Sequence, residues 1–129
     1  MVDQVVPDIL KVKTLKKIIM NLEVESINDL KIVVIQGRLD TTNAGEFEQK
    51  MTEILNGGCT RLLLDCSGLN YISSSGLRVF LVVQKKMKLV NGQFRLFGLQ
   101  PAIREIFDIA GFSVILTILP DRDFALKSI

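Results

Sequence analysis

Residues 62–83 read LLLDCSGLNYISSSGLRVFLVV, and the rest of the chain is organised around this stretch. Three leucines at 62–64 precede a segment rich in turn residues, and a longer apolar run follows Gly76. This order is typical of a buried strand, a loop and a buried helix. Serines occupy positions 73–75, where the loop becomes the helix, and their hydroxyls are the best-placed reactive groups in the chain.

The composition indicates one compact domain. A chain of 129 residues can bury a substantial core, and its 48% hydrophobic content argues against disorder. No apolar run approaches the ~20 residues of a membrane-spanning helix. The N-terminus also lacks the basic-then-apolar order of a secretory signal. We therefore expect a cytoplasmic protein without stable membrane insertion.

The chain has no histidine, which disfavours catalysis. Histidine is the usual base for a serine nucleophile and the commonest zinc ligand. Cys59 and Cys66 are not spaced as a metal pair, and Cys66 is expected to be a small core residue. The net charge of +2 is too small to indicate nucleic-acid binding. We expect a protein that is not an enzyme and that holds neither a metal nor a cofactor.

Strand-like and helix-like segments alternate along the chain. Strands are expected at 22–25, 30–36, 60–66, 93–97 and 113–119, and helices from Asn43 to Gly57, from the serines to about Val90, from Pro101 to Gly111 and over 121–127. The order β-β-α-β-α-β-α-β-α predicts an α/β fold with one mixed sheet and helices packed on it. Residues 62–64 do not alternate in polarity, so their strand should be covered on both faces. Asn43 and Glu46 resemble a capping box.

Residues 1–20 stand apart as an N-terminal extension. Single apolar residues there are interleaved with Lys11, Lys13, Lys16 and Lys17. One interpretation is a poorly ordered extension, because chain termini are commonly loose. The other is a basic amphipathic helix that touches a membrane or a partner. The domain itself is expected over residues 21–129.

The serines at 73–75 allow two interpretations. Serines at a helix start are ordinarily caps. A helix start also offers unpaired N–H groups and a positive dipole end, so a phosphate is tolerated there. A phosphoserine adds about −1.5 to −2 charges, enough to change a docking surface. Gly76 would let a partner's backbone approach this turn closely.

Residues 65–78, DCSGLNYISSSGLR, resemble the signature of the STAS domain, which is named for sulfate transporters and anti-sigma factor antagonists. Two further blocks are similar to the family in the same register, GRLD at 37–40 and PAIREIFDIAGF at 101–112. Together the three blocks imply a STAS domain over residues 21–129.

The resemblance also implies which residues form the site. The family's phosphorylated serine falls on Ser74, and Ser73 occupies the place where many antagonists carry aspartate. Asp40 matches an aspartate that lies beside the serine in the family and contributes to docking; the alternative is a plain loop-capping carboxylate. Arg78 replaces a common glycine. The expected partner-binding residues are Asp40, Thr41, Ser73, Ser75, Gly76 and Arg78.

The resemblance implies a bacterial anti-sigma factor antagonist that regulates transcription by partner switching. Its unphosphorylated form would bind an anti-sigma factor of the serine-kinase type, and phosphorylation of Ser74 would weaken that docking. A phosphatase of the PP2C type would restore it. ATP and magnesium would belong to the kinase, because this chain has no phosphate-cradling glycine loop. The alternatives are a phosphorylation-independent scaffold in a signalling assembly, which Ser73 in place of aspartate favours, and a nucleotide-binding domain.

Overall fold

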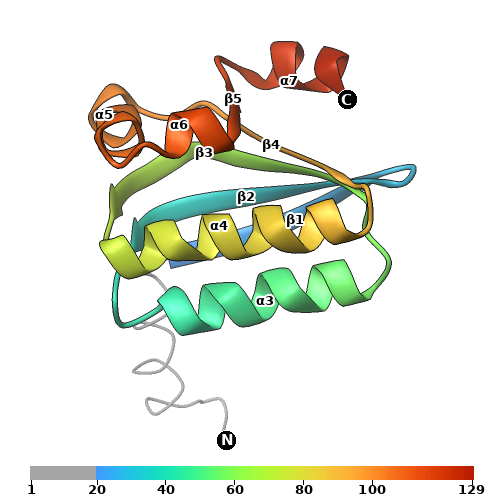
Figure 1. The fold of residues 1–129 in the computed structure, drawn as a ribbon, viewed down its shortest axis with the longest axis horizontal. Helices are drawn as coiled ribbons and strands as arrows, with labels where there is room; N and C mark the ends of the chain where they lie inside the picture. The colour runs from blue at the N-terminus through green and yellow to red at the C-terminus, as the bar shows by residue number, and fades with distance from the viewer. Residues whose placement is uncertain (1–19) are drawn as a thin grey trace, which may run out of the picture.

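The computed structural model describes residues 20–129 and shows a single sheet flanked by helices (Figure 1). The elements are β1 (Met20–Ile27), β2 (Leu30–Leu39), α3 (Ala44–Asn56), β3 (Arg61–Ile72), α4 (Ser74–Leu89), β4 (Gln93–Phe97), α5 (Pro101–Ile109), α6 (Phe112–Ile115), β5 (Thr117–Leu119) and α7 (Arg122–Ser128). The predicted extension over residues 1–20 lies outside the described residues, apart from Met20, which begins β1.

The five strands lie in the order β1-β2-β3-β4-β5. β1 and β2 form an antiparallel hairpin, in which Asn28 takes the left-handed conformation at φ +55° that asparagine tolerates in turns. The other three strand pairs are parallel, and helical segments make the connections between them. The predicted mixed sheet of an α/β fold is therefore confirmed.

The main core lies between the sheet and the two long helices, α3 and α4, which run side by side across one face (Figure 1). The ring of Phe47 from α3 lies 5.7 Å from that of Phe80 in α4. Phe80 in turn meets Phe107 of α5 edge to face at 5.4 Å. These aromatic contacts join three helices over β3.

β3 is buried on both faces at residues 62–64, as the lack of alternation there predicts. Leu62 and Leu64 belong to the core under α3 and α4. Leu63 points to the opposite face, where it joins a smaller cluster with Phe97 and with Ala125 of α7. Because both faces are covered, consecutive leucines are stable in this one strand.

The strands that lead to the serine turn are longer than predicted. β3 continues through Ile72, and β2 continues through Leu39 beside it, with irregular register along the shared edge. Gly68 permits this pairing, because a Cβ there would stand 2.9 Å from Cγ of Gln36. The turn-like residues after Cys66 are therefore strand residues.

The prediction of a strand over 113–119 is wrong for its first part. Residues 112–115 form the short helix α6, and β5 is confined to Thr117–Leu119. Gly111 turns the chain at φ +80°, and the ring of Phe112 then packs edge to face on Phe107 at 6.2 Å. This contact holds the segment against α5, so Val114 is exposed instead of entering the sheet.

We expect Leu64→Ala to destabilise the fold by about 2–5 kcal/mol, because it removes a side chain that is fully buried at the centre of the sheet. The measurement is equilibrium unfolding in urea. The matched control is Leu89→Ala in α4, where the side chain is 85% exposed and the change should be within about 0.5 kcal/mol. Equal stability of the two variants would contradict the burial of β3.

Candidate functional site

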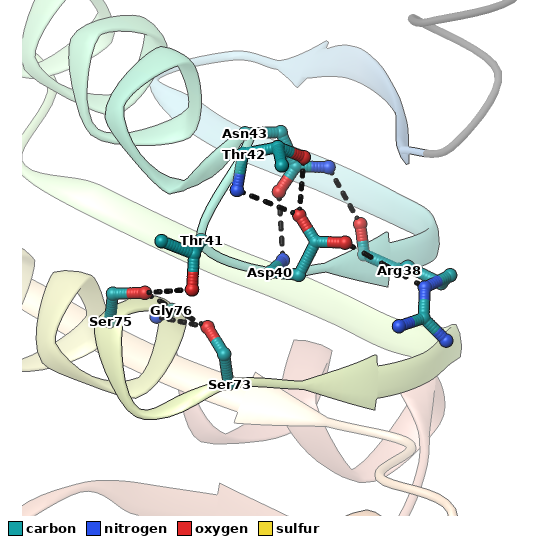
Figure 2. A network of polar contacts seen from close by, with 8 residues as sticks. All are labelled: Arg38, Asp40, Thr41, Thr42, Asn43, Ser73, Ser75 and Gly76. Atoms are coloured by element: carbon teal, nitrogen blue, oxygen red, sulfur yellow. Dashed lines mark hydrogen bonds and ion pairs between the residues drawn. The ribbon is translucent and has the colours of Figure 1, made fainter.

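The candidate site lies where β2 and β3 end beside each other (Figure 2). The backbone N–H of Ser73, which follows β3, donates a hydrogen bond of 2.9 Å to the carbonyl of Leu39 at the end of β2. Parallel strands place their carboxyl ends at one edge of a sheet. The loop at 40–43 and the turn at 73–76, far apart in the sequence, therefore meet.

Two of the three serines are held by hydrogen bonds. Ser73 has an extended backbone and caps α4, since its Oγ accepts from the N–H of Gly76 at 3.1 Å. The hydroxyls of Ser73 and Ser75 lie 3.0 Å apart. The Ser75 hydroxyl also reaches that of Thr41 across the site at 3.5 Å. Ser73 and Ser75 are half-buried, and their hydroxyls join the two segments (Figure 2).

Ser74 differs from its neighbours. It is the first residue of α4, it is exposed, and its hydroxyl makes no hydrogen bond to another residue in 20–129. The first turn of α4 carries no acidic side chain. A negative group on Ser74 would therefore meet the favourable end of the helix dipole without local charge repulsion from that turn. Of the three serines, Ser74 is therefore the most accessible.

Asp40 organises the loop beside the serine turn. One of its oxygens accepts hydrogen bonds from the hydroxyl of Thr42 at 2.6 Å and from the Thr42 N–H at 3.0 Å. The other lies 3.7 Å from Nε of Arg38. The Thr42 hydroxyl bond, helped by the Arg38 charge, lowers the pKa of Asp40 below its usual range. Asp40 is thus a loop-capping carboxylate that stays ionised at neutral pH.

Asn43 stabilises the same loop through its side chain, although the sequence suggested that it caps α3. Its side chain accepts from the N–H of Asp40 and donates to the carbonyl of Arg38, both at 2.8 Å, and it is buried. It makes no side-chain cap bond to α3, so the capping-box interpretation is wrong. Both polar ends of the amide are used within the loop, which fixes Asp40 in place.

The structure gives Gly76 a packing role. It is buried, and a Cβ there would lie 2.8 Å from Cγ of Leu39 and 3.1 Å from Cγ1 of Ile72. A side chain would therefore push α4 away from the two strand ends. Close packing inside the domain is thus one reason for a glycine at this position, and its approach to the backbone of a partner stays a prediction.

Arg78 lies one turn into α4 and is exposed. Its Nη2 is 3.6 Å from Oε1 of Glu48 in α3. On the other side of the site, the guanidinium of Arg38 lies 4.0 Å from the ring centroid of Tyr71, a cation–π contact. The sequence reasoning did not place Thr42 or Glu48 in the site, and it assigned Asn43 to a helix cap. The D-x-T spacing after β2 could have indicated the turn at Asp40, but no sequence signal indicates the contact across helices to Glu48.

The two cysteines lie away from this site. Both are buried free thiols, and burial raises the pKa of each, most strongly that of Cys66. The prediction that Cys66 is a small core residue is confirmed. Within residues 20–129, no group of three or more histidine, cysteine or acidic residues is arranged to hold a metal ion, and no helix is long and apolar enough to cross a membrane.

The model of the STAS domain family matches residues 21–125, so this chain belongs to the STAS domain family. It is 37% identical over 106 residues to a candidate anti-sigma factor antagonist, BtrV of Bordetella bronchiseptica, across 82% of this chain and 91% of that protein. The fold matches that of an anti-sigma factor antagonist from Mycobacterium paratuberculosis, with a TM-score of 0.78, 23% identity and 84% and 92% of the two chains covered. It also matches the phosphorylated form of the Bacillus cell fate determinant SpoIIAA, with a TM-score of 0.66, 18% identity and 84% and 98% covered. The predicted family is confirmed.

We expect Gly76→Ala to destabilise the fold by about 1–3 kcal/mol, because the added methyl group overlaps Leu39. Chemical denaturation measures the change. Gly45→Ala in α3 is the control, since a Cβ there meets nothing within 4 Å and alanine favours the helix by roughly 0.5–1 kcal/mol. If Gly76→Ala stabilised the protein as Gly45→Ala should, the close approach of α4 to β2 would be contradicted.

We expect Thr42→Val to raise the pKa of Asp40 toward its usual value, because it removes the hydroxyl that lowers this pKa most. A depressed folded-state pKa contributes stability that is present above the unfolded value of about 3.9 and is lost as the pH falls through the folded-state pKa. Carboxyl ¹³C NMR titration measures the pKa of Asp40 in the folded protein. Thr52→Val in α3 should leave the Asp40 pKa unchanged, and an equal effect of both substitutions would count against the Thr42 contact.

Proposed function

We propose that this protein is an anti-sigma factor antagonist whose unphosphorylated form binds an anti-sigma factor with serine-kinase activity. Phosphorylation of Ser74 ends that interaction. The observation that carries the proposal is that Ser74 alone among the three serines is exposed, with its hydroxyl unbonded to other residues in 20–129. Membership of the STAS family and the likeness to a candidate antagonist support it.

Phosphorylation would require only an accessible serine hydroxyl from this chain. The kinase would transfer the γ-phosphoryl group of ATP to Oγ of Ser74, the hydroxyl proton would pass to a base of the kinase, and ADP would leave. ATP and magnesium arrive with the kinase in this scheme. The chain therefore acts as a regulatory binding protein in the cytoplasm, and a PP2C-type phosphatase would remove the phosphate to restore binding.

The proposed docking surface follows the exposed residues around Ser74. Thr41 and Arg78 are exposed, and Asp40 and Ser75 are half-buried. A phosphate adds about −1.5 to −2 charges in the middle of these residues. A surface complementary to the unmodified hydroxyl would lose both its fit and its charge complementarity.

Ser73 keeps the structural role that an aspartate in its position would have. Its hydroxyl oxygen accepts the hydrogen bond from the N–H of Gly76, as a carboxylate oxygen could. The turn therefore retains its geometry while carrying one negative charge less beside Ser74. This supports a site that is still shaped for a kinase, with a recognition surface of different charge.

We expect Ser74→Ala to bind the partner and Ser74→Asp to weaken binding by roughly tenfold or more, because the carboxylate places charge at the centre of the docking surface. The partner is first recovered from native extract with phosphatase-treated protein and identified by mass spectrometry, and affinity is then measured by calorimetry. The matched control is Ser26→Asp. Ser26 is an exposed serine of β1 next to the turn between β1 and β2, and this turn lies at the far end of the sheet from the serine turn (Figure 1).

Phosphopeptide mapping after incubation with this partner and ATP completes the test. Phosphate should appear on Ser74, and the Ser74→Ala chain should remain unmodified. Equal affinity of the alanine and aspartate variants would refute the switch and indicate a phosphorylation-independent scaffold. Phosphate found on Ser73 or Ser75 alone would overturn the assignment to Ser74.

A further inference from the structure

Arg78 lies in the position from which a helical side chain can reach Ser74. The two residues are four apart in α4, so their side chains share one face of the helix, and both are exposed. Side chains in a helix lean toward its N-terminus. The long side chain of Arg78 can therefore extend along the turn that begins with Ser74.

The ion pair between Arg78 and Glu48 is weak. Its contact with Glu48 is a single N–O approach of 3.6 Å, and the arginine side chain is 68% exposed. Exposed ion pairs of this kind contribute little free energy. A phosphate dianion offers the guanidinium a stronger acceptor, because two N–H groups can bind two phosphate oxygens at once.

The other charged groups near the turn each make more than one contact. Arg38 pairs with Asp40 and stacks on Tyr71, and the Asp40 carboxylate accepts two hydrogen bonds from Thr42. The next basic residue on α4 is Lys85, eleven residues after Ser74 and roughly 16 Å along the helix axis. Arg78 is thus the basic side chain of α4 best placed to bind a group on Ser74.

We propose that phosphorylated Ser74 draws Arg78 away from Glu48, so that the guanidinium binds the phosphate and the ion pair between α3 and α4 is broken. The inference rests on the proposed phosphorylation of Ser74 and adds the group that receives the phosphate. Its consequence is that one modification changes the surface at two places. A phosphate–arginine pair forms at the start of α4, and the Glu48 carboxylate on α3 loses its arginine.

The test installs phosphoserine at position 74 by genetic encoding, so that no kinase is required, and follows the phosphate by ³¹P NMR titration. Arg78 stabilises the dianion, so Arg78→Gln should raise the second pKa of the phosphate by roughly half a unit. Lys85→Gln removes the same charge from the same helix and should shift it by less than about 0.2 units. Equal pKa values in the two variants would overturn the proposal.

A second substitution tests the competition with Glu48. Glu48→Gln frees Arg78, so it should lower the phosphate pKa more in the Arg78 background than in the Arg78→Gln background. An effect of the same size in both would reflect only the lost charge and would contradict the exchange of partners. Because the phosphoserine is genetically encoded, these outcomes do not depend on a kinase. Failure of the chain to be phosphorylated by its partner would contradict the proposed function alone.

Discussion

The close approach of α4 to the end of β2 is the constraint on which the site depends. At Gly76 the helix backbone is so near Leu39 that a Cβ would overlap its side chain, and the N–H of Ser73 bonds to the Leu39 carbonyl. These two contacts fix where the helix begins relative to the sheet. The same geometry brings Ser75 within reach of Thr41 from the neighbouring loop. A core-packing requirement and the arrangement of the polar surface are therefore satisfied by one glycine.

The three serines divide structural and surface roles between them. Ser73 supplies the acceptor that a helix start needs, and Ser75 joins that hydroxyl to the adjacent loop. Because these two positions meet the hydrogen-bonding needs of the turn, Ser74 can stay exposed without leaving a buried polar group unsatisfied. Substitution or modification at Ser74 can thus change the surface while the turn keeps its shape.

The fold class could be predicted from the sequence because apolar spacing differs between a doubly covered strand and the helices that cover it. The ends of strands and helices that depend on contacts with distant residues could not be predicted in this way. Residues 67–72 resemble a turn, yet they extend β3 because Gly68 lets β2 run beside them. Asn43 has the chemistry of a cap, but its neighbours in the folded loop offer the amide two better partners. The loop at 40–43 and the turn at 73–76 meet, which the family resemblance implied for Asp40 and the serine. The ion pair between Arg78 and Glu48 depends instead on how two helices pack.

The position of Ser74 also limits how a phosphate there could act in the proposed switch. At the first residue of α4 the helix dipole favours negative charge, so the modification stabilises the local backbone instead of unfolding it. Its effect must then fall on the surface that faces the partner. Charges on exposed groups are screened beyond about 8–10 Å at physiological salt. In the proposed switch, a phosphate would therefore repel a partner only if the partner's own surface reached the serine turn. The switch thus requires docking at the start of α4 and not along its distal, lysine-rich end.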